Sequence, residues 1–483
     1  MPFRGGAARA GPWLALLTLI VLYFLYVFHV GAVGWLGPDE PRYSSIGFAM
    51  AAAGDWVAPR LWGEVWFEKP PLTYWLAALG KSAGLSGEWA ARLPVAFLSI
   101  VFLAGFVYIT RRLLSLEAAA IAGILLATSA GWVAFSQLAV TDLPLAATFC
   151  SSVLLLVWWT EGGPRWTLPV AGAFLGLAIL AKGLVPVALF APLVLMYWRR
   201  WRALPAFLGT TLLVALPWYW AVTLRYGRAF LDDFFWKHHF QRFATGALQH
   251  GQPWWFYVPI LLAGLLPWTP LIAKVRPAEW WRAPHTRALL LVCGWGCAFF
   301  SASRAKLPGY VLPLLPLFCI LIAVSLAEAP VLRRLLPACV LLLAFLPVTA
   351  AILPQALADG ISSVGAVTLR WHYLAIVLLP AAAVYWLERG GRRLAAFTLA
   401  GLAAAAGFVW LKIEVYPVLD RTVTARVLTA QVRPHAARAC ADGLPRAILY
   451  GLNAYLNTSL PDCDETPRPV HVTPEGLRYF DSQ

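Results

Sequence analysis

Three carboxylates in this sequence lie where a charged side chain is costly unless it is used or paired. The segment GPDEPRYSSIGFAM places Asp39 and Glu40 directly after a long apolar run. The segment LAVTDLPL places Asp142 at the start of another such run. Each acid has a simpler explanation, as a solvated cap of a helix or as an N-cap. Their alternative use is as general bases, because an ionised carboxylate can accept a proton from a reacting hydroxyl.

Cations accompany these acids in other loops. The segment FEKPP holds Glu68 and Lys69 before two prolines, which stiffen the chain and fix the cation near the membrane interface. The segment SRAKLPGYVLP holds Arg304, Lys306 and Tyr310. A single basic side chain near the interface is often only a contact to lipid headgroups. Several cations and acids in separate loops instead predict an active site for a phosphorylated, lipid-borne substrate.

A third cationic segment is HHFQRFATG, which holds His238, His239 and Arg242. Adjacent histidines are poorly spaced to bind one metal ion, and no further cluster of histidine and cysteine accompanies them. We therefore expect that the protein requires no metal ion, although the sequence does not exclude a bound divalent ion. The sequence also lacks a phosphate-binding Walker loop and a dinucleotide-binding glycine motif, so a nucleotide-driven mechanism has no support.

Composition shows which elements must position these residues. Of the 483 residues, 60% are hydrophobic and 13% are charged, far from the balance of a soluble domain. Such a chain needs the bilayer as its solvent, and its apolar runs must be helices because lipid cannot satisfy backbone groups. The net charge of +15 does not indicate a nucleic-acid partner here, since arginine accumulates in cytoplasmic loops of membrane proteins.

The apolar runs predict an all-α polytopic membrane protein with about thirteen transmembrane helices. A cytoplasmic N-terminus places the short arginine-rich loops inside, and then the loops 37–91 and 224–253 and the tail lie outside. We predict a transmembrane catalytic domain over 1–411 and a small periplasmic domain over 412–483. The predicted spans lie near 12–34, 92–110, 117–135, 143–160, 167–181, 184–198, 203–223, 254–273, 287–302, 308–327, 332–353, 371–387 and 394–411.

Three predictions concern the segments outside the membrane. Within the first long loop, residues 71–85 are apolar on one side and too short to span, which predicts a helix lying in the interface. In the tail, the alternating segment 446–452 (RAILYGL) is compatible with a strand, so we expect a small α+β domain. Cys440 and Cys463 lie in this polar tail and could form a disulfide in an oxidising compartment.

Lys182, between two short spans, could reach the outer headgroups or point into a cavity.

Six motifs together resemble the GT-C glycosyltransferases of the aminoarabinose transferase and protein mannosyltransferase type. They follow the family's order over roughly the first two thirds of the chain. The resemblance implies an integral-membrane enzyme that moves a sugar from a polyprenyl-phosphate donor to an acceptor on the outer face. The motifs are DEPRY, GDWVAPRLWGEVWFEKPPLTYWL, EWAARLP, TDLPL, AKGLVP and SRAKLPGYVLP.

The resemblance also implies roles for individual residues. Asp39 matches the acid nearest the chemistry, with Glu40 beside it, and Asp142 matches the second essential acid. The positions that match contacts to the donor phosphate are Lys69, Arg242, Lys306 and Tyr310. The expected supporting residues are Arg42, Tyr43, Glu68, His239 and Arg304. The sequence departs from the family at His238, where related chains often have glutamate before histidine.

These expectations define one mechanism and one rival. A single displacement at the anomeric carbon predicts inversion, with a lipid (lipid A-like), a glycan or a protein as acceptor. We expect a monomer in the bacterial inner membrane with its active site facing the periplasm. The rival is a transporter or flippase of lipid-linked sugars, for which paired repeats with broken helices at the membrane midplane would be typical. The sequence shows no clear internal repeat. The transferred sugar, the acceptor and the role of the tail stay open.

Overall fold

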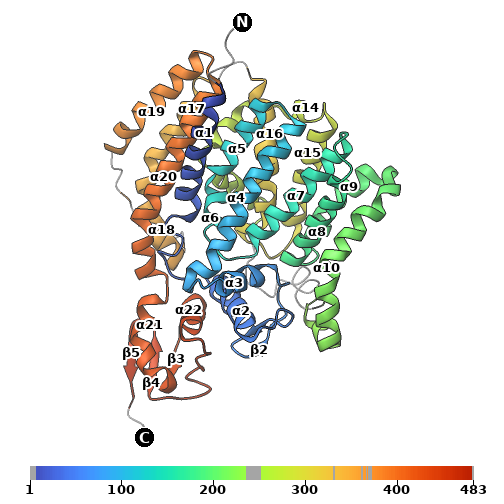
Figure 1. Ribbon diagram of the computed structural model, residues 1–483. Helices are drawn as coiled ribbons and strands as arrows, with labels where there is room; N and C mark the ends of the chain where they lie inside the picture. The colour runs from blue at the N-terminus through green and yellow to red at the C-terminus, as the bar shows by residue number, and fades with distance from the viewer. Residues whose placement is uncertain are drawn as a thin grey trace.

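The computed structural model describes residues 7–234, 236, 252–329, 332–360, 363–365, 367 and 372–480. These residues are mainly helical, and the long helices stand side by side in one bundle (Figure 1). The helices of the first half are α1 (Ala7–Leu22), the π-helix η1 (Tyr23–Val27), α2 (Asp39–Ala53), α3 (Leu72–Ser82), α4 (Gly87–Leu113), α5 (Leu116–Ala127), α6 (Ala130–Phe135), α7 (Asp142–Thr160), α8 (Thr167–Lys182), α9 (Val185–Tyr197), η2 (Trp198–Ala203), α10 (Leu204–Tyr226) and α11 (Arg228–Leu231).

The second half continues the bundle and then leaves it. Its helices are α13 (Tyr257–Gly264), η4 (Thr269–Lys274), α14 (Pro277–Trp280), α15 (Pro284–Ala302), η5 (Pro308–Leu314), α16 (Leu315–Ala327), α17 (Leu335–Leu341), η6 (Leu342–Phe345), α18 (Leu346–Asp359), α19 (His372–Arg389), α20 (Arg393–Thr422), α21 (Arg426–Val432), η8 (Arg433–Arg438) and α22 (Arg446–Leu456). The strands are β1 (Arg60–Leu61), β2 (Glu64–Val65), β3 (Ala439–Ala441), β4 (Val470–Thr473) and β5 (Gly476–Tyr479).

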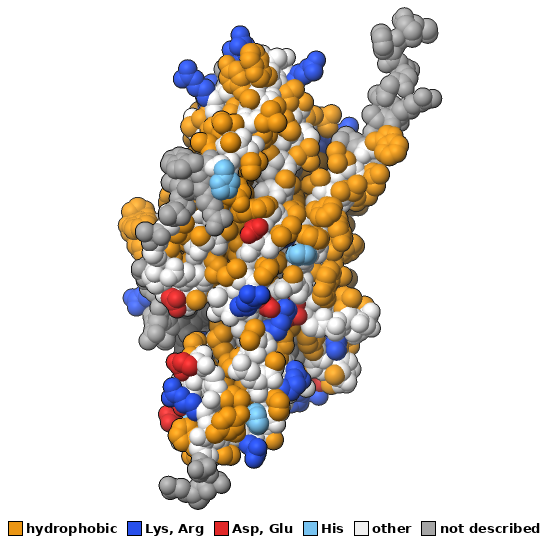
Figure 2. Space-filling model, turned by 90° about the vertical axis from the view of Figure 1, so that its left-hand side faces the viewer, with side chains coloured by type: hydrophobic (Ala, Val, Ile, Leu, Met, Phe, Trp, Pro, Cys, Tyr) orange, Lys and Arg blue, Asp and Glu red, His pale blue; other side chains and the backbone are white. Residues whose placement is uncertain are grey.

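The expected class of an all-α polytopic membrane protein is confirmed. Among the described residues, six helical segments are long and apolar enough to cross a membrane, and three shorter helices are also apolar. Figure 2 shows mostly hydrophobic side chains over the upper half of one face, with lysine and arginine at its top end and again from mid-height downwards. The total of about thirteen spans stays a prediction. The six segments are Gly87–Leu113, Asp142–Thr160, Leu204–Tyr226, Pro308–Ala327, Leu335–Asp359 and Arg393–Arg438.

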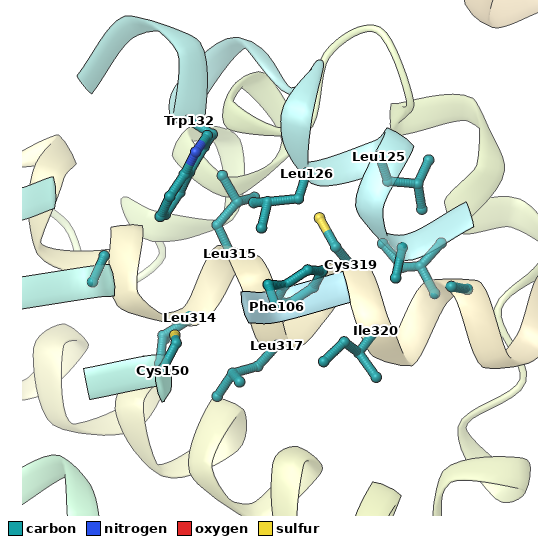
Figure 3. Close-up of a cluster of buried hydrophobic side chains, with 14 of the residues drawn as sticks. Phe106, Leu125, Leu126, Trp132, Cys150, Leu314, Leu315, Leu317, Cys319 and Ile320 are labelled. Atoms are coloured by element: carbon teal, nitrogen blue, oxygen red, sulfur yellow. The ribbon is translucent and has the colours of Figure 1, made fainter. Parts of the chain in front are cut away.

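The bundle packs around α7. In the most apolar window of α7, 89% of the residues are buried, against 28% in α10, so α7 is central and α10 lies at the rim. Leucine, phenylalanine and cysteine side chains from α4, α5, α7 and α16 fill the space beside it (Figure 3). The free cysteines Cys150, Cys293, Cys319 and Cys339 are buried, as their apolar surroundings in the sequence indicate.

The first long loop folds into two helices, α2 and α3, at one end of the bundle (Figure 1). The predicted interfacial helix over 71–85 corresponds to α3, and the DEPRY segment forms the first turn of α2. These two helices pack against each other, and α3 also packs on α4. Asp39 is the first residue of α2 and Asp142 the first residue of α7, and both line the same cavity.

The tail forms a small α+β unit, as expected. Its sheet has the order β3-β4-β5, with β3 parallel and β5 antiparallel to β4. The strand predicted over 446–452 is wrong, because this segment is the start of helix α22. Ile448, Leu449 and Leu452 follow helical spacing and pack into the tail core, together with Tyr455 and Leu456 beyond the predicted strand. A window of seven residues was too short to separate the alternation of a strand from the 3.6-residue period of a helix.

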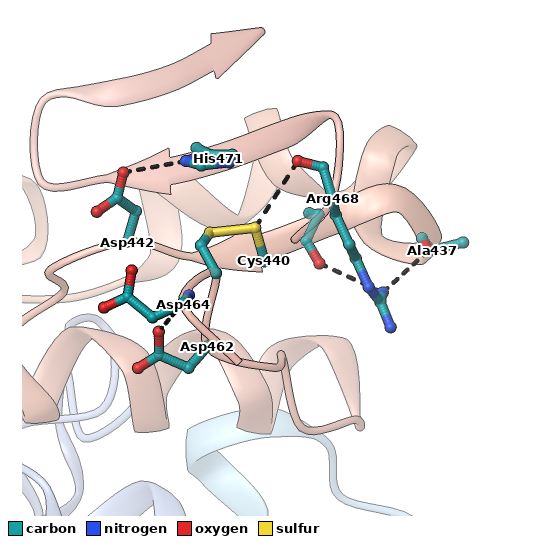
Figure 4. The surroundings of a disulfide bond; sticks show 9 residues. Ala437, Cys440, Asp442, Asp462, Asp464, Arg468 and His471 are labelled. Carbon is teal, nitrogen blue, oxygen red and sulfur yellow. Dashed lines mark hydrogen bonds and ion pairs between the residues drawn. A yellow bond between two sulfur atoms is a disulfide. The ribbon is translucent and has the colours of Figure 1, made fainter. Parts of the chain in front are cut away.

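A disulfide joins Cys440 in β3 to Cys463 in the loop before β4 (Figure 4). Nearby, His471 pairs with Asp442 at 3.1 Å, and the Arg468 guanidinium donates a hydrogen bond to the carbonyl of Ala437 at 2.9 Å.

Helix α20 runs through Thr422 and therefore passes the predicted domain boundary at residue 411. The division into two domains stays a prediction.

Candidate active site

Most of the predicted site residues that the structure describes meet in one cavity of about 130 Å³. Its wall includes the start of α2, the start of α7, the end of α8, the end of α15 and the segment around η5. The elements come from distant parts of the chain, so only the bundle brings them together. The predicted residues that line it are Asp39, Tyr43, Glu68, Lys69, Asp142 and Tyr310.

Four charged residues on one side of the cavity form a chain of ion pairs. Arg42 pairs with Asp39 one helical turn away, and its other terminal nitrogen lies 2.9 Å from a Glu68 oxygen. The second Glu68 oxygen lies 3.0 Å from the Lys69 ammonium. The Asp39 side chain is 42% exposed and the Arg42 side chain 4%, so the acid faces the open space and the arginine supports it from behind.

Electrostatics keep Arg42 charged and Tyr43 neutral. Burial by itself lowers the pKa of Arg42, but the negative charges of Glu68 and Asp39 outweigh it, and the net pKa is raised. Burial raises the pKa of Tyr43 well above its ordinary value, and the charges of Asp39 and Glu68 add to this. Tyr43 therefore contributes an uncharged phenol to the wall.

Another part of the cavity wall is built around Asp142. The Lys182 ammonium lies 2.8 Å from an Asp142 oxygen and 4.6 Å from the ring centre of Tyr310. Gly309 makes room for this arrangement, because a Cβ atom built there would lie 2.5 Å from the same carboxylate oxygen. Since the Asp142 and Lys182 side chains are only 16% and 11% exposed, their pairing is only weakly screened by solvent.

Glu40 lies outside this cavity. It is fully buried and binds the Arg92 guanidinium with both oxygens, each at 2.7 Å. The same oxygens accept hydrogen bonds from the backbone N–H groups of Leu36 and Ala139. These four bonds use both oxygens and indicate a structural role, while the catalytic role expected from the sequence stays a prediction. Glu40 ties the start of α2 to α4 and to the segment before α7.

The remaining predicted residues have other positions. Lys306 is buried and donates a hydrogen bond to the carbonyl of Ser303 at 2.6 Å, while its neighbours Ala305 and Leu307 line the cavity. Arg304 is exposed. Arg242 and His239, together with His238, lie outside the described residues, so their roles stay predictions.

Sequence reasoning did not assign Lys182 to the site. The motif AKGLVP placed this lysine between two short apolar segments, where a headgroup contact and a cavity were both open. In the fold Lys182 lines the cavity, because α8 ends beside the start of α7 and the two helices pack along their length. The available signal was the lysine's position at the end of an apolar run.

The sequence family described as dolichyl-phosphate-mannose-protein mannosyltransferase matches residues 68–221, which contain Lys69, Asp142 and Lys182. The chain is also similar to curated proteins named undecaprenyl phosphate-alpha-4-amino-4-deoxy-L-arabinose arabinosyl transferase. The one from Pseudomonas paraeruginosa is 37% identical over 307 residues, 59% of this chain and 54% of that protein. The one from Edwardsiella ictaluri is 31% identical over 328 residues, 64% and 58%. The chain spans about half the length of the curated relatives it matches.

Among solved structures, the crystal structure of ArnT from Cupriavidus metallidurans bound to undecaprenyl phosphate superposes with a TM-score of 0.78. The identity is 24%, over 96% of this chain and 94% of that one. The chain has the GT-C fold. The resemblance expected from the six motifs is confirmed, and the match extends through the second half of the GT-C bundle, where the motifs are sparse.

Proposed function

We propose that the chain is a membrane glycosyltransferase that takes 4-amino-4-deoxy-L-arabinose from undecaprenyl phosphate and transfers it to a lipid A-like acceptor. The sugar and carrier rest on the names of the similar proteins. A glycan or a protein hydroxyl is a less favoured acceptor. The observation that carries the proposal is the cavity whose wall holds the acids Asp39 and Asp142 together with the cations Lys69 and Lys182.

The reaction that suits this cavity is one displacement at the anomeric carbon. The acceptor oxygen forms a bond to that carbon while the bond from carbon to the phosphate oxygen breaks. The electron pair leaves with undecaprenyl phosphate, and the acceptor proton passes to a carboxylate. Backside attack inverts the anomeric centre. No oxidant, reductant or nucleotide is consumed.

The two acids are suited to different parts of this reaction. Asp39 is the more exposed and opens on the cavity, so we assign it the role of general base. Asp142 is held at 2.8 Å by Lys182, which suits it to orient the sugar or the acceptor. The fixed pairing reduces the reorganisation needed when the transition state forms.

The cations suit the leaving group. Departure of the sugar concentrates negative charge on the phosphate, and preorganised ammonium or guanidinium groups stabilise that charge. Lys69 lines the cavity, and we assign this role to it. We retain Arg242, Lys306 and Tyr310 as further proposed contacts to the phosphate, because the family motifs place them there.

We also propose the orientation. The arginine-rich short loops favour a cytoplasmic side opposite to the cavity, which puts the site on the periplasmic face of the bacterial inner membrane. The disulfide in the tail supports this, because such bonds persist in oxidising compartments.

The test is transfer by the purified full-length protein in detergent or nanodiscs. Undecaprenyl-phosphate aminoarabinose and lipid A are mixed with the protein, and the product is detected by mass spectrometry. We expect a mass increase of one aminoarabinose and release of undecaprenyl phosphate. Absence of product with lipid A and with glycan or peptide acceptors would contradict the proposal. Movement of the intact donor across a vesicle membrane without transfer would favour the transporter.

A further inference from the structure

A tyrosine from the C-terminal tail reaches the group of charges behind Asp39. Helix α22 of the tail packs against α2 at the cavity end of the bundle (Figure 1). The ring centre of Tyr450 lies 5.2 Å from the guanidinium carbon of Arg42 and 5.6 Å from the ring centre of Trp62. The two partners belong to segments more than 380 residues away in sequence.

The guanidinium nitrogens of Arg42 make hydrogen bonds, and aromatic rings lie close to its guanidinium carbon. Its Nε atom donates to the carbonyl of Pro38 at 3.1 Å, and its terminal nitrogens bind Asp39 and Glu68. The ring centre of Trp66 lies 5.5 Å from the guanidinium carbon of Arg42, so Trp66 accompanies Tyr450 there. Aromatic faces attract cations, and the attraction grows when water is excluded. With the Arg42 side chain only 4% exposed, the ring from the tail contributes to that exclusion.

We propose that Tyr450 is a positioning residue for the transfer reaction, acting through Arg42 on the general base Asp39. The inference rests on the proposed function and extends it, because it makes the tail part of the catalytic machinery. Tyr450 touches neither substrate nor the reacting atoms in this scheme. Its ring limits the movement of Arg42, and Arg42 in turn directs the Asp39 carboxylate into the cavity.

Helix α22 has a second attachment that does not involve Tyr450. The hydroxyl of Tyr455 pairs with Glu88 at the start of α4 and accepts a hydrogen bond from the backbone N–H of Trp35 at 3.3 Å. Glu88 also binds Arg426 of α21 at 2.8 Å. These contacts fasten the tail to the bundle independently, so removal of the ring at position 450 leaves the tail docked.

The test compares Tyr450→Leu with Tyr450→Phe in the full-length protein. Leucine keeps apolar volume against Trp62 but offers no aromatic face, whereas phenylalanine keeps the face. We expect kcat to fall about tenfold in Y450L, equivalent to about 1.4 kcal/mol. The KM for the undecaprenyl-phosphate donor should stay within about twofold, and Y450F should restore kcat. Tyr479→Ala removes an exposed tyrosine of the same tail, on β5, and is the matched control.

Each outcome decides the inference. A kcat loss confined to Y450L, with unchanged thermal unfolding and no new protease cleavage between the bundle and the tail, supports it. Equal kcat in Y450L and Y450F overturns it, and so does a loss that appears as weaker donor binding or as release of the tail. If the wild-type protein itself shows no transfer, the proposed function fails instead, and the two failures are thus distinguishable.

Discussion

Lys182, the last residue of α8, lies with its ammonium 2.8 Å from the carboxylate of Asp142, the first residue of α7. The same ammonium lies over the ring of Tyr310 at 4.6 Å. The pair forms part of the cavity wall, which also includes Asp39, Glu68 and Lys69. A carboxylate held in this way has a defined direction before any substrate binds, which is the geometric requirement for orienting a sugar hydroxyl.

Replacing Lys182 by methionine should lower kcat for transfer by about a hundredfold, because Asp142 then loses the cation that orients it. Purified K182M, D142N and the double variant are compared in the mass-spectrometric assay. If the two residues act as a unit, the double variant should be no worse than the poorer single variant. Losses that multiply would show that Lys182 and Asp142 act separately.

Replacing Asp39 by asparagine should reduce kcat by at least about a hundredfold while donor binding persists, because the amide cannot accept the acceptor proton. Donor affinity is measured with labelled undecaprenyl-phosphate aminoarabinose. Asp55→Asn is a matched control, since Asp55 lies outside the cavity and pairs with Arg225. Wild-type turnover in D39N would remove Asp39 from the mechanism.

Gly309→Ala should impair transfer more than folding. The added Cβ would come within 2.5 Å of the Asp142 carboxylate oxygen, so the carboxylate must turn away from Lys182. We expect about a tenfold loss of kcat with a small change in thermal unfolding. Gly209→Ala in α10 is the control, because a Cβ there meets nothing within 4 Å. Equal activity of both variants would show that the carboxylate moves without cost.

Removing Glu40 should destabilise the protein rather than block chemistry. Glu40→Ala leaves the buried guanidinium of Arg92 without its anion, which typically costs about 3–5 kcal/mol. The expected result is a lower thermal unfolding temperature and a lower yield of folded protein. Glu40→Gln keeps part of the hydrogen bonding and should retain turnover per folded molecule. A stable E40Q protein without turnover would support the catalytic role expected from the sequence.

Loss of the disulfide should destabilise the tail selectively. The bond closes a loop over a sequence separation of 23 residues, for which about 3 kcal/mol is expected. The double variant Cys440→Ser and Cys463→Ser should therefore expose the tail to limited proteolysis at lower temperature than the wild type. Cys297→Ser, at a free cysteine of α15, is the control. Unchanged proteolysis would show that the tail core suffices without the bond.

The sequence predicted the helical membrane class and much of the site from local patterns. Apolar runs are a direct consequence of solvation by lipid, so they can be recognised without tertiary information. The acids Asp39 and Asp142 and the cation Lys69 stand out because charge is rare beside such runs. The strand expected over 446–452 was wrong because a short segment satisfies two periodicities, and packing of α22 on the tail core decided between them.

The sequence by itself therefore determined that the chain folds in a lipid bilayer, which chemical groups it offers and which segments carry them. The tertiary structure decided which of two adjacent acids faces the cavity. Asp39 and Glu40 differ by one position in α2, and a rotation of about 100° per residue sends one side chain to the open space and the other to Arg92. It also brought Lys182 to Asp142 and Tyr450 to Arg42, because contacts between helices distant in the chain depend on the packing of the whole bundle.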